Sequence, residues 1–273
     1  MLRSSFVVNE SSDELPGGPP DVAGLGVGPL GTRSIVLSAL LGTHPPALTA
    51  RGLVALAELF GIRPGTTRAA LSRMVSAGEL VAVDGRYALA GRLLRRQREQ
   101  DVGRAPSPGA WDGSWTTAIA LDDRRSMARR RAFRDEMASA GLAELRPDIW
   151  MRPANVPAPP TGPDVVVTVG ALHEVDERGL VARLWPLDEL DARARRIAAA
   201  LEARRGAIDG GDVENLPDTF TVAAAAVRFL RLEPRLPAAL QPPDWAPPTL
   251  RPRYDDFDAA FTRQLRAFFA SVR

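Results

Sequence analysis

The order of elements between residues 32 and 90 constrains the fold more than any other feature of this sequence. Apolar residues at helical spacing, each run ended by a glycine, predict helices over 34–41, 52–60 and 66–77. Two short apolar runs follow, 80–83 and 86–89, and they flank Asp84-Gly85. Asp-Gly between two such runs is a strong signal for a β-hairpin. Three helices followed by a hairpin indicate a winged helix-turn-helix.

The third of these predicted helices has two unlike faces. Its apolar face is formed by Thr67, Leu71, Met74 and Val75. The opposite face carries small, hydroxylated and basic side chains: Thr66, Ala69, Arg73 and Ser76. A helix fits the DNA major groove, small residues let its backbone approach the bases, and arginine can donate two hydrogen bonds to guanine. We therefore predict that this face binds DNA, whereas Arg68, at its edge, either contacts phosphate or lies along the core.

Positive charge is concentrated in the same part of the chain. Residues 63–104 contain nine arginines and four acidic residues, whereas the whole chain has a net charge of only +2. A local basic surface of this kind is typical of DNA binding. Arg86, beside the predicted turn, is either a DNA contact of the hairpin or a solvated cross-strand residue. The competing interpretation of the whole element is a winged helix that contacts only proteins.

The rest of the sequence predicts further parts of an α+β chain. Strands are predicted over 116–121, 145–152, 165–169 and 180–185, with a helix over 124–140 among them. Helices are predicted over 187–203, 220–232 and 257–272. The expected parts are a flexible tail (1–31), the winged helix (32–90), a basic linker helix (91–109), a ferredoxin-like α/β sandwich (110–186) and a helical C-terminal domain (187–273).

Composition excludes several classes of function. The chain has no cysteine, which excludes disulfides, thiol nucleophiles and thiolate metal sites. Its two histidines, His44 and His173, lie too far apart in the sequence to have local ligand spacing. No run approaches the roughly 20 apolar residues of a membrane span, and no secretory signal is recognisable. We expect a cytoplasmic protein without a metal, a cofactor or enzymatic activity.

Several motifs in a fixed order resemble one known family. They are Thr32-Arg33-Ser34-Ile35-Val36, Thr67 to Met74, Gly78-Glu79-Leu80, Trp111-Asp112-Gly113-Ser114-Trp115, Leu145 to Pro153, Leu232 to Pro237, and Leu240 to Trp245. In this order they resemble the PaaX-type transcriptional regulators, the repressor class of phenylacetic acid catabolism. The resemblance implies a homodimer that binds double-stranded operator DNA, with the ferredoxin-like domain used for dimerisation. It also implies repression of an aromatic catabolic operon, relieved when an aryl-acyl-CoA such as phenylacetyl-CoA binds.

An effector site is less sharply marked than the DNA-binding face. The candidates are Trp111 and Trp115 for an acyl pocket, and Arg125 and Arg129 for the CoA phosphates. The two tryptophans could equally anchor the domain boundary, and the arginines could form a solvated helix face, which are the interpretations we favour.

The sequence is also compatible with two enzymatic functions. One is a metal-dependent nuclease that uses the ferredoxin-like domain, with Asp122 as a magnesium ligand, although an aspartate there also caps a helix. The other is a CoA-ester enzyme with His173 as its base, although a lone histidine near acidic residues is more often an exposed loop residue.

Overall fold

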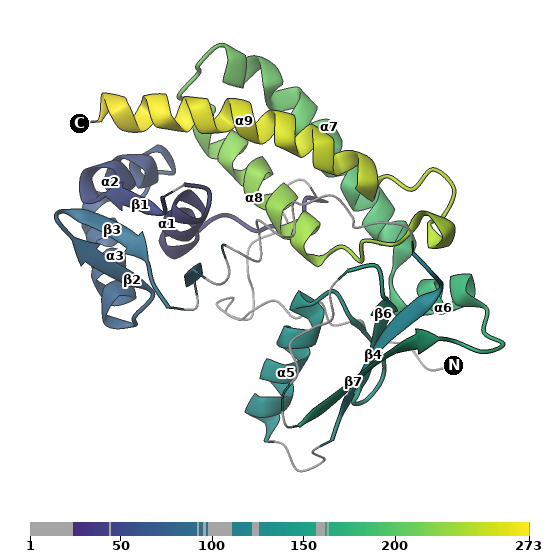
Figure 1. Cartoon of the computed structure of the whole chain (residues 1–273). Coiled ribbons are helices and arrows are strands. Elements are labelled where there is room, and N and C mark those ends of the chain that lie inside the picture. Colours follow the sequence, from purple (N-terminus) through teal and green to yellow (C-terminus); the bar gives the residue numbers. More distant parts are fainter. Residues whose placement is uncertain are drawn as a thin grey trace. The chain divides into compact units, whose positions relative to one another are not determined.

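The computed structural model describes residues 24–43, 45–91, 93–94, 97, 111–121, 126–156, 162 and 164–272. It has mixed α and β structure, with two small antiparallel sheets and a helical C-terminal region (Figure 1). The described residues fall into two compact units. The sheet unit contains 111–185 and 236–241, and the helical unit contains 24–97, 186–235 and 242–272.

The helical unit begins with three short helices and a small sheet. Its elements are α1 (Thr32–Leu41), β1 (Ala47–Thr49), α2 (Ala50–Leu59), α3 (Pro64–Ser76), β2 (Leu80–Val83) and β3 (Arg86–Leu89). The Thr49 side chain caps α2 by accepting a hydrogen bond from the Gly52 amide, and Pro64 lies in the first turn of α3. Asp84 and Gly85 both have positive φ, as the turn between β2 and β3 requires. The three predicted helices and the hairpin are confirmed, and β1 joins the hairpin in the strand order β1-β3-β2.

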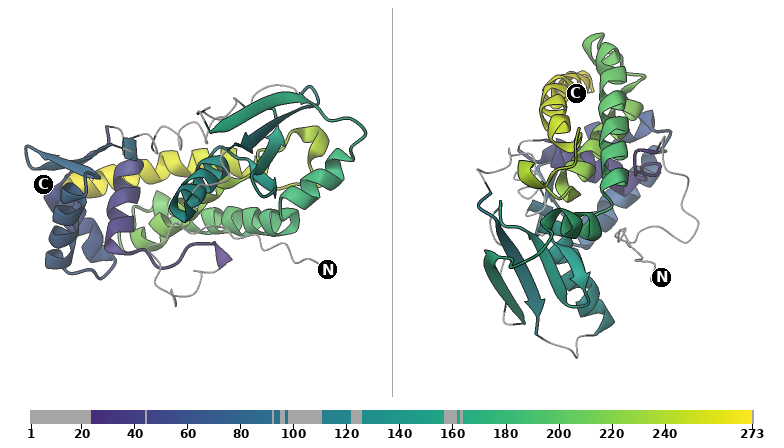
Figure 2. Two further views of the ribbon diagram at one scale, coloured as in Figure 1. Left: turned by 90° about the horizontal axis from the view of Figure 1, so that it is seen from below. Right: turned by 90° about the vertical axis from the view of Figure 1, so that its right-hand side faces the viewer.

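Three long helices complete the helical unit: α7 (Leu187–Asp209), α8 (Leu216–Leu232) and α9 (Pro247–Ser271). All three were predicted, and each is longer than its apolar pattern indicated. Figures 1 and 2 show α9 packed along α7 and α8. Buried side chains at helical spacing line their contacts, including Ile197 and Leu201 of α7, Phe229 of α8, and Phe257 and Phe261 of α9.

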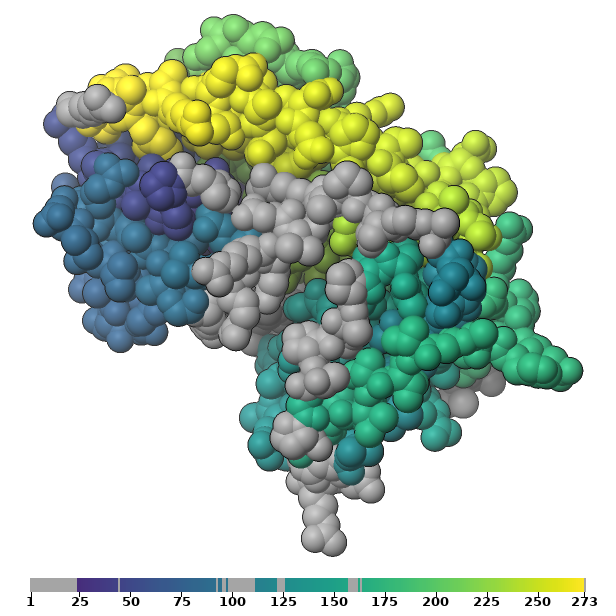
Figure 3. All heavy atoms as spheres, in the orientation of Figure 1, coloured from purple at the N-terminus to yellow at the C-terminus, as the bar shows by residue number. Residues whose placement is uncertain are grey.

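One hydrophobic core joins the first and last parts of the helical unit. Ile35, Leu40 and Leu71 of α1 and α3 belong to the same cluster of buried residues as Phe229 and Phe261. The sequence pattern suggested separate domains for residues 32–90 and 187–273, whereas here their apolar faces cover each other. Figure 3 shows atoms of the blue N-terminal elements directly against the yellow end of α9.

Residues 24–31 also belong to this core, although their composition predicted a flexible tail. Leu25 and Val27 are 4% and 6% exposed and pack in the shared cluster. Residues 1–23 of the expected tail lie outside the described residues.

The sheet unit is built on a four-stranded antiparallel sheet. Its elements are β4 (Ser114–Ala120), α5 (Met127–Ser139), β5 (Ala143–Arg146), β6 (Ile149–Pro153), β7 (Val165–Ala171), α6 (Glu177–Leu184) and the 3-10 helix η2 (Ala238–Leu240). The strand order is β5-β6-β4-β7. α5 covers one face, where Met137 packs with Ala118 of β4 and Trp150 of β6. The strands predicted over 116–121 and 165–169 and the helix predicted over 124–140 are confirmed within a few residues, as β4, β7 and α5. The single strand predicted over 145–152 is wrong, because a turn at Pro147 and Asp148, where the φ of Asp148 is +68°, divides it into the antiparallel strands β5 and β6.

The strand predicted over 180–185 is wrong, because these residues form most of α6. Asp176 caps the helix by accepting a hydrogen bond from the Gly179 amide, and Glu177 lies in the first turn. Val181 and Leu184 are buried and lie three positions apart, which is a helical spacing. The short run of valine and leucine suggested a strand, whereas the capping aspartate that starts the helix lies upstream of that run.

Candidate nucleic-acid interface

The turn between α2 and α3 and the buried side chains of α3 determine which face of α3 is exposed. Gly61 has a φ of +74°, which ends α2, and the Ile62 amide then donates to the Ala57 carbonyl at 3.1 Å. Thr67, Leu71 and Met74 are buried against the core as predicted, Val75 is half-buried, and Ala70 is also buried. This inward stripe fixes the rotation of α3 about its axis.

The opposite face of α3 is open. Exposed residues on it are Thr66, Arg68, Ala69, Ser72, Arg73 and Ser76. Among the described residues, no acidic group lies within 4.0 Å of the Arg68 or Arg73 guanidinium. The Ser76 hydroxyl donates to the Ser72 carbonyl at 3.1 Å. The four residues predicted on this face are therefore together on one surface, and Ser72, which the sequence did not single out, lies between them.

The β2–β3 hairpin has one basic and two apolar side chains exposed to solvent. Arg86 is exposed, and its Nη2 donates to the Ala47 carbonyl of β1 at 2.7 Å. This bond crosses from β3 to β1 and leaves the side chain exposed, so both sequence-based interpretations of Arg86 stay predictions. On β2, Val81 and Val83 are 45% and 61% exposed and point to the same side, because strand side chains alternate. No sequence pattern indicated that these valines would face solvent.

A buried carboxylate ties α3 and the hairpin to α1. Glu79, 7% exposed, accepts hydrogen bonds from Arg33 Nε at 3.1 Å and Nη2 at 2.6 Å. The Glu79 amide donates to the Met74 carbonyl of α3, and its own carbonyl accepts from Ala90 just after β3. A bidentate arginine–carboxylate pair is directional, so it fixes the turn between α3 and β2. Arg33 lies 46 positions away, too far for a local sequence pattern to find.

The segment after the hairpin is only partly described. Leu93 is buried, and Gln97 Nε2 donates to the Leu41 and Thr43 carbonyls at 2.9 and 3.2 Å. These contacts pin the end of α1. Most of the predicted basic linker helix, 91–109, lies outside the described residues.

The effector candidates lie in the sheet unit. Trp115 is 1% exposed and its indole N–H donates to Glu177 of α6 at 2.9 Å. Trp111 donates to the Ser114 carbonyl at 2.6 Å, and the two rings meet edge to face at 6.3 Å. Arg129 is exposed on α5, and Arg125 lies outside the described residues. Both indole N–H groups are therefore engaged within the unit.

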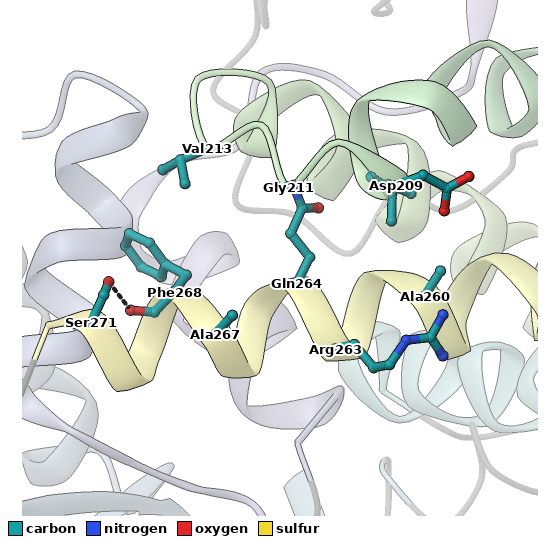
Figure 4. Close-up of a pocket in the computed structure, with 10 residues that line it drawn as sticks. Asp209, Gly211, Val213, Ala260, Arg263, Gln264, Ala267, Phe268 and Ser271 are labelled. Carbon is teal, nitrogen blue, oxygen red and sulfur yellow. Dashed lines mark hydrogen bonds between the residues drawn. The ribbon is translucent and has the colours of Figure 1, made fainter.

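A hollow of about 350 Å³ opens between the end of α7 and one face of α9. Its α9 wall includes Ala260, Gln264 and Phe268, and Val213 lies on the opposite side (Figure 4). Gln264 reaches across it, and its Nε2 donates to the Asp212 carbonyl at 2.9 Å. The sequence did not single out this hollow.

The residues of the enzymatic alternatives are placed only in part. Asp122 lies outside the described residues, and His173 is exposed after β7. Within the described ranges, no group of three or more His, Cys, Asp or Glu side chains could hold a metal ion. In that same part of the chain, no helix is both long and apolar enough to cross a membrane.

Two comparisons with known proteins give matches, one to the N-terminal elements and one to most of the chain. A family model described as "PaaX-like protein" matches residues 31–93, the stretch that contains α1 to α3 and β1 to β3. Among solved structures, the uncharacterized protein Rv0674 from Mycobacterium tuberculosis is 36% identical. The similarity covers 87% of this chain and 98% of that one, with a TM-score of 0.66. No curated protein matches the chain.

Proposed function

This chain belongs to the PaaX-like protein family, and from that premise we propose that it is a DNA-binding transcriptional regulator. The observation that carries the proposal is the outward face of α3. It presents two arginines without acidic partners among the described residues, surrounded by small and hydroxylated side chains. Such a surface can enter the major groove, donate to guanine and contact phosphate.

In this proposal residues 32–90 are a winged helix-turn-helix, with α3 as the recognition helix and β2–β3 as the wing. Thr66, Arg68, Ala69, Arg73 and Ser76 are the proposed contacts in and beside the groove. Arg86 contributes from the wing, with one of its nitrogens already bound to Ala47. The basic segment 91–109, which follows these residues in the sequence, adds positive charge to this part of the chain.

The sheet unit is proposed to dimerise the protein. The succession β4-α5-β5-β6-β7 supports a ferredoxin-like sandwich over 110–186, with residues 187–273 as the helical C-terminal part. β7 is an edge strand whose Val166 and Val169 are 40% and 59% exposed. Exposed apolar side chains on a strand with one free edge are suited to contact a second copy. A two-fold dimer presents two recognition helices to a pseudo-palindromic operator.

Replacing Arg73 with alanine tests the DNA-binding face. We expect specific affinity to fall by about 1 to 3 kcal/mol if Arg73 donates to guanine. If it contacts phosphate instead, the loss is similar on all sequences and the salt slope falls by about one. The measurement is fluorescence anisotropy on DNA from upstream of the gene, with a scrambled duplex as reference.

The matched control is Arg205→Ala, which removes an exposed arginine whose acidic partner among the described residues is Glu202 of α7. It should leave DNA affinity unchanged. Unchanged affinity and an unchanged salt slope for Arg73→Ala would remove Arg73 from the interface. Wild-type protein that shows no preference for any genomic DNA would contradict the proposed function itself.

The regulator is further proposed to be a cytoplasmic, non-catalytic repressor of an aromatic catabolic operon. Its effector is an aryl-acyl-CoA, for which Trp111, Trp115, Arg125 and Arg129 are the candidate contacts. We expect phenylacetyl-CoA to lower operator affinity in the same anisotropy measurement, whereas coenzyme A alone should not. Specific DNA binding that does not change when phenylacetyl-CoA is added would support the regulator function and contradict this effector.

A further inference from the structure

Residues 24–30, which we call the strap, lead directly into α1. Leu25 and Val27 are buried in the core of the helical unit, and Leu30 packs against the same core. Gly31, directly after the strap, accepts the first helical hydrogen bond of α1 from the Ile35 amide at 3.0 Å. The position of the strap therefore determines the position of the first turn of α1.

Two arginines of α7 hold the strap by its backbone. Arg193 Nε donates to the Leu25 carbonyl at 3.2 Å, and its Nη2 reaches the Gly26 carbonyl at 3.4 Å. Arg196 Nε donates to the Gly24 carbonyl at 2.9 Å. The Arg193 guanidinium also lies 5.8 Å from the centre of the Phe229 ring of α8. Three successive carbonyls are thus bound by side chains that are themselves fixed by the helices.

The strap sequence fits this contact closely. Gly24 and Gly26 have φ of +69° and +74°, a conformation that glycine adopts readily and other residues do not. A Cβ on Gly26 would collide with the Arg193 guanidinium, the group that binds the strap. A side chain at position 26 would therefore displace the arginine as well as strain the backbone.

A continuous set of contacts leads from the strap to the recognition helix. The strap fixes the start of α1, and α1 carries Arg33, whose guanidinium binds Glu79 between α3 and β2. α7 is thereby joined to the end of α3 through hydrogen bonds to the strap, the chain that leads into α1, and the Arg33–Glu79 ion pair, in addition to the apolar core.

We propose that the strap is a positioning element for DNA recognition. Docked on Arg193 and Arg196, it holds α1 and α3 in one orientation on the C-terminal helices, so that the dimer accepts one spacing between operator half-sites. This inference rests on the proposed function, because spacing has meaning only for a dimer that binds two half-sites.

Arg193→Ala and Gly26→Ala release the strap by different routes. Their matched controls are Arg205→Ala and Gly206→Ala, which alter exposed positions on the same helix, and a Cβ on Gly206 meets nothing within 4 Å. Arg193→Lys keeps the charge and one donor group and should recover part of the effect. Two variants at opposite sides of the contact ensure that a folding defect in one does not decide the result.

The first readout is amide hydrogen exchange in α1 and α3. Both strap variants should exchange at least about fivefold faster there than their controls, with the α5 amides unaffected. The second readout is anisotropy on the operator and on the same operator with two base pairs inserted between its half-sites. Wild-type protein should prefer the native spacing by about tenfold, and the strap variants should lose most of that preference.

The outcomes separate the strap from the proposed function. Equal amide exchange in variants and controls would contradict the proposed role of the strap. Strap variants that keep the full preference for the native half-site spacing would contradict it as well. If wild-type protein binds no operator, the proposed function fails, and the spacing role of the strap fails with it. Faster exchange in α1 and α3 would then still establish that the strap holds these helices.

Discussion

Replacing Glu233 with alanine is expected to lower the free energy of unfolding by about 3 to 5 kcal/mol. Glu233 follows α8 directly, and its side chain is 3% exposed. Its carboxylate pairs with Arg251 of α9, which is itself buried, and accepts the Arg235 amide at 2.8 Å. Without Glu233, the Arg251 charge would remain buried without this counter-ion.

The surroundings of Arg235 increase the cost of losing Glu233. Burial lowers the pKa of Arg235, repulsion from Arg251 lowers it further, and Glu233 opposes both effects. One carboxylate therefore offsets the charge of two neighbouring guanidinium groups at the junction of α8 and α9.

Urea denaturation followed by circular dichroism measures this loss. Glu202→Ala is the matched control, because it removes an exposed glutamate whose i,i+3 partner is Arg205, and such pairs contribute about 0.5 kcal/mol at most. A Glu233→Ala protein within about 1 kcal/mol of wild type would show that the pair is solvated in solution.

The elements that sequence predicted correctly are those specified by their own residues. α3 has an apolar stripe of helical period and a glycine after it, and the β2–β3 turn has Asp84-Gly85. The exposed and buried faces of α3 follow from the same period, so the helical pattern alone places Arg73 and Ser76 on the outward face. Residues 180–185 lacked such a clear local signal, and there the prediction was wrong.

The features that sequence could not predict depend on contacts between distant residues. Arg33 and Glu79 are 46 positions apart, and Leu25 and Arg193 are 168 apart. A composition rich in glycine predicted a flexible tail, and residues 25–30 indeed form no helix or strand, yet composition could not show that α7 provides hydrogen-bond partners for residues 24–26. The shared core could not be predicted for the same reason. An apolar helix face indicates that the face is buried, but it does not identify the element that packs against it.

Replacing Phe220 with alanine tests whether that core makes one cooperative unit. Phe220 of α8 is 3% exposed and lies between Phe60, at the end of α2, and Phe261 of α9. Its ring meets theirs edge to face, with centroids 5.7 and 6.0 Å apart. Removing it leaves a cavity at the joint, and we expect a loss of about 3 to 5 kcal/mol.

The distribution of this loss is more informative than its size. If α1–α3 and α7–α9 unfold together, Phe220→Ala will raise amide exchange in both sets by the same factor. Phe133→Ala, a half-buried phenylalanine of α5, is the control and should affect the sheet unit alone. Faster exchange confined to α7–α9 would mean that α1–α3 fold independently of the C-terminal helices. In the cooperative case, the packing of Phe220 against Phe60 couples α8 to the end of α2, the helix that precedes α3.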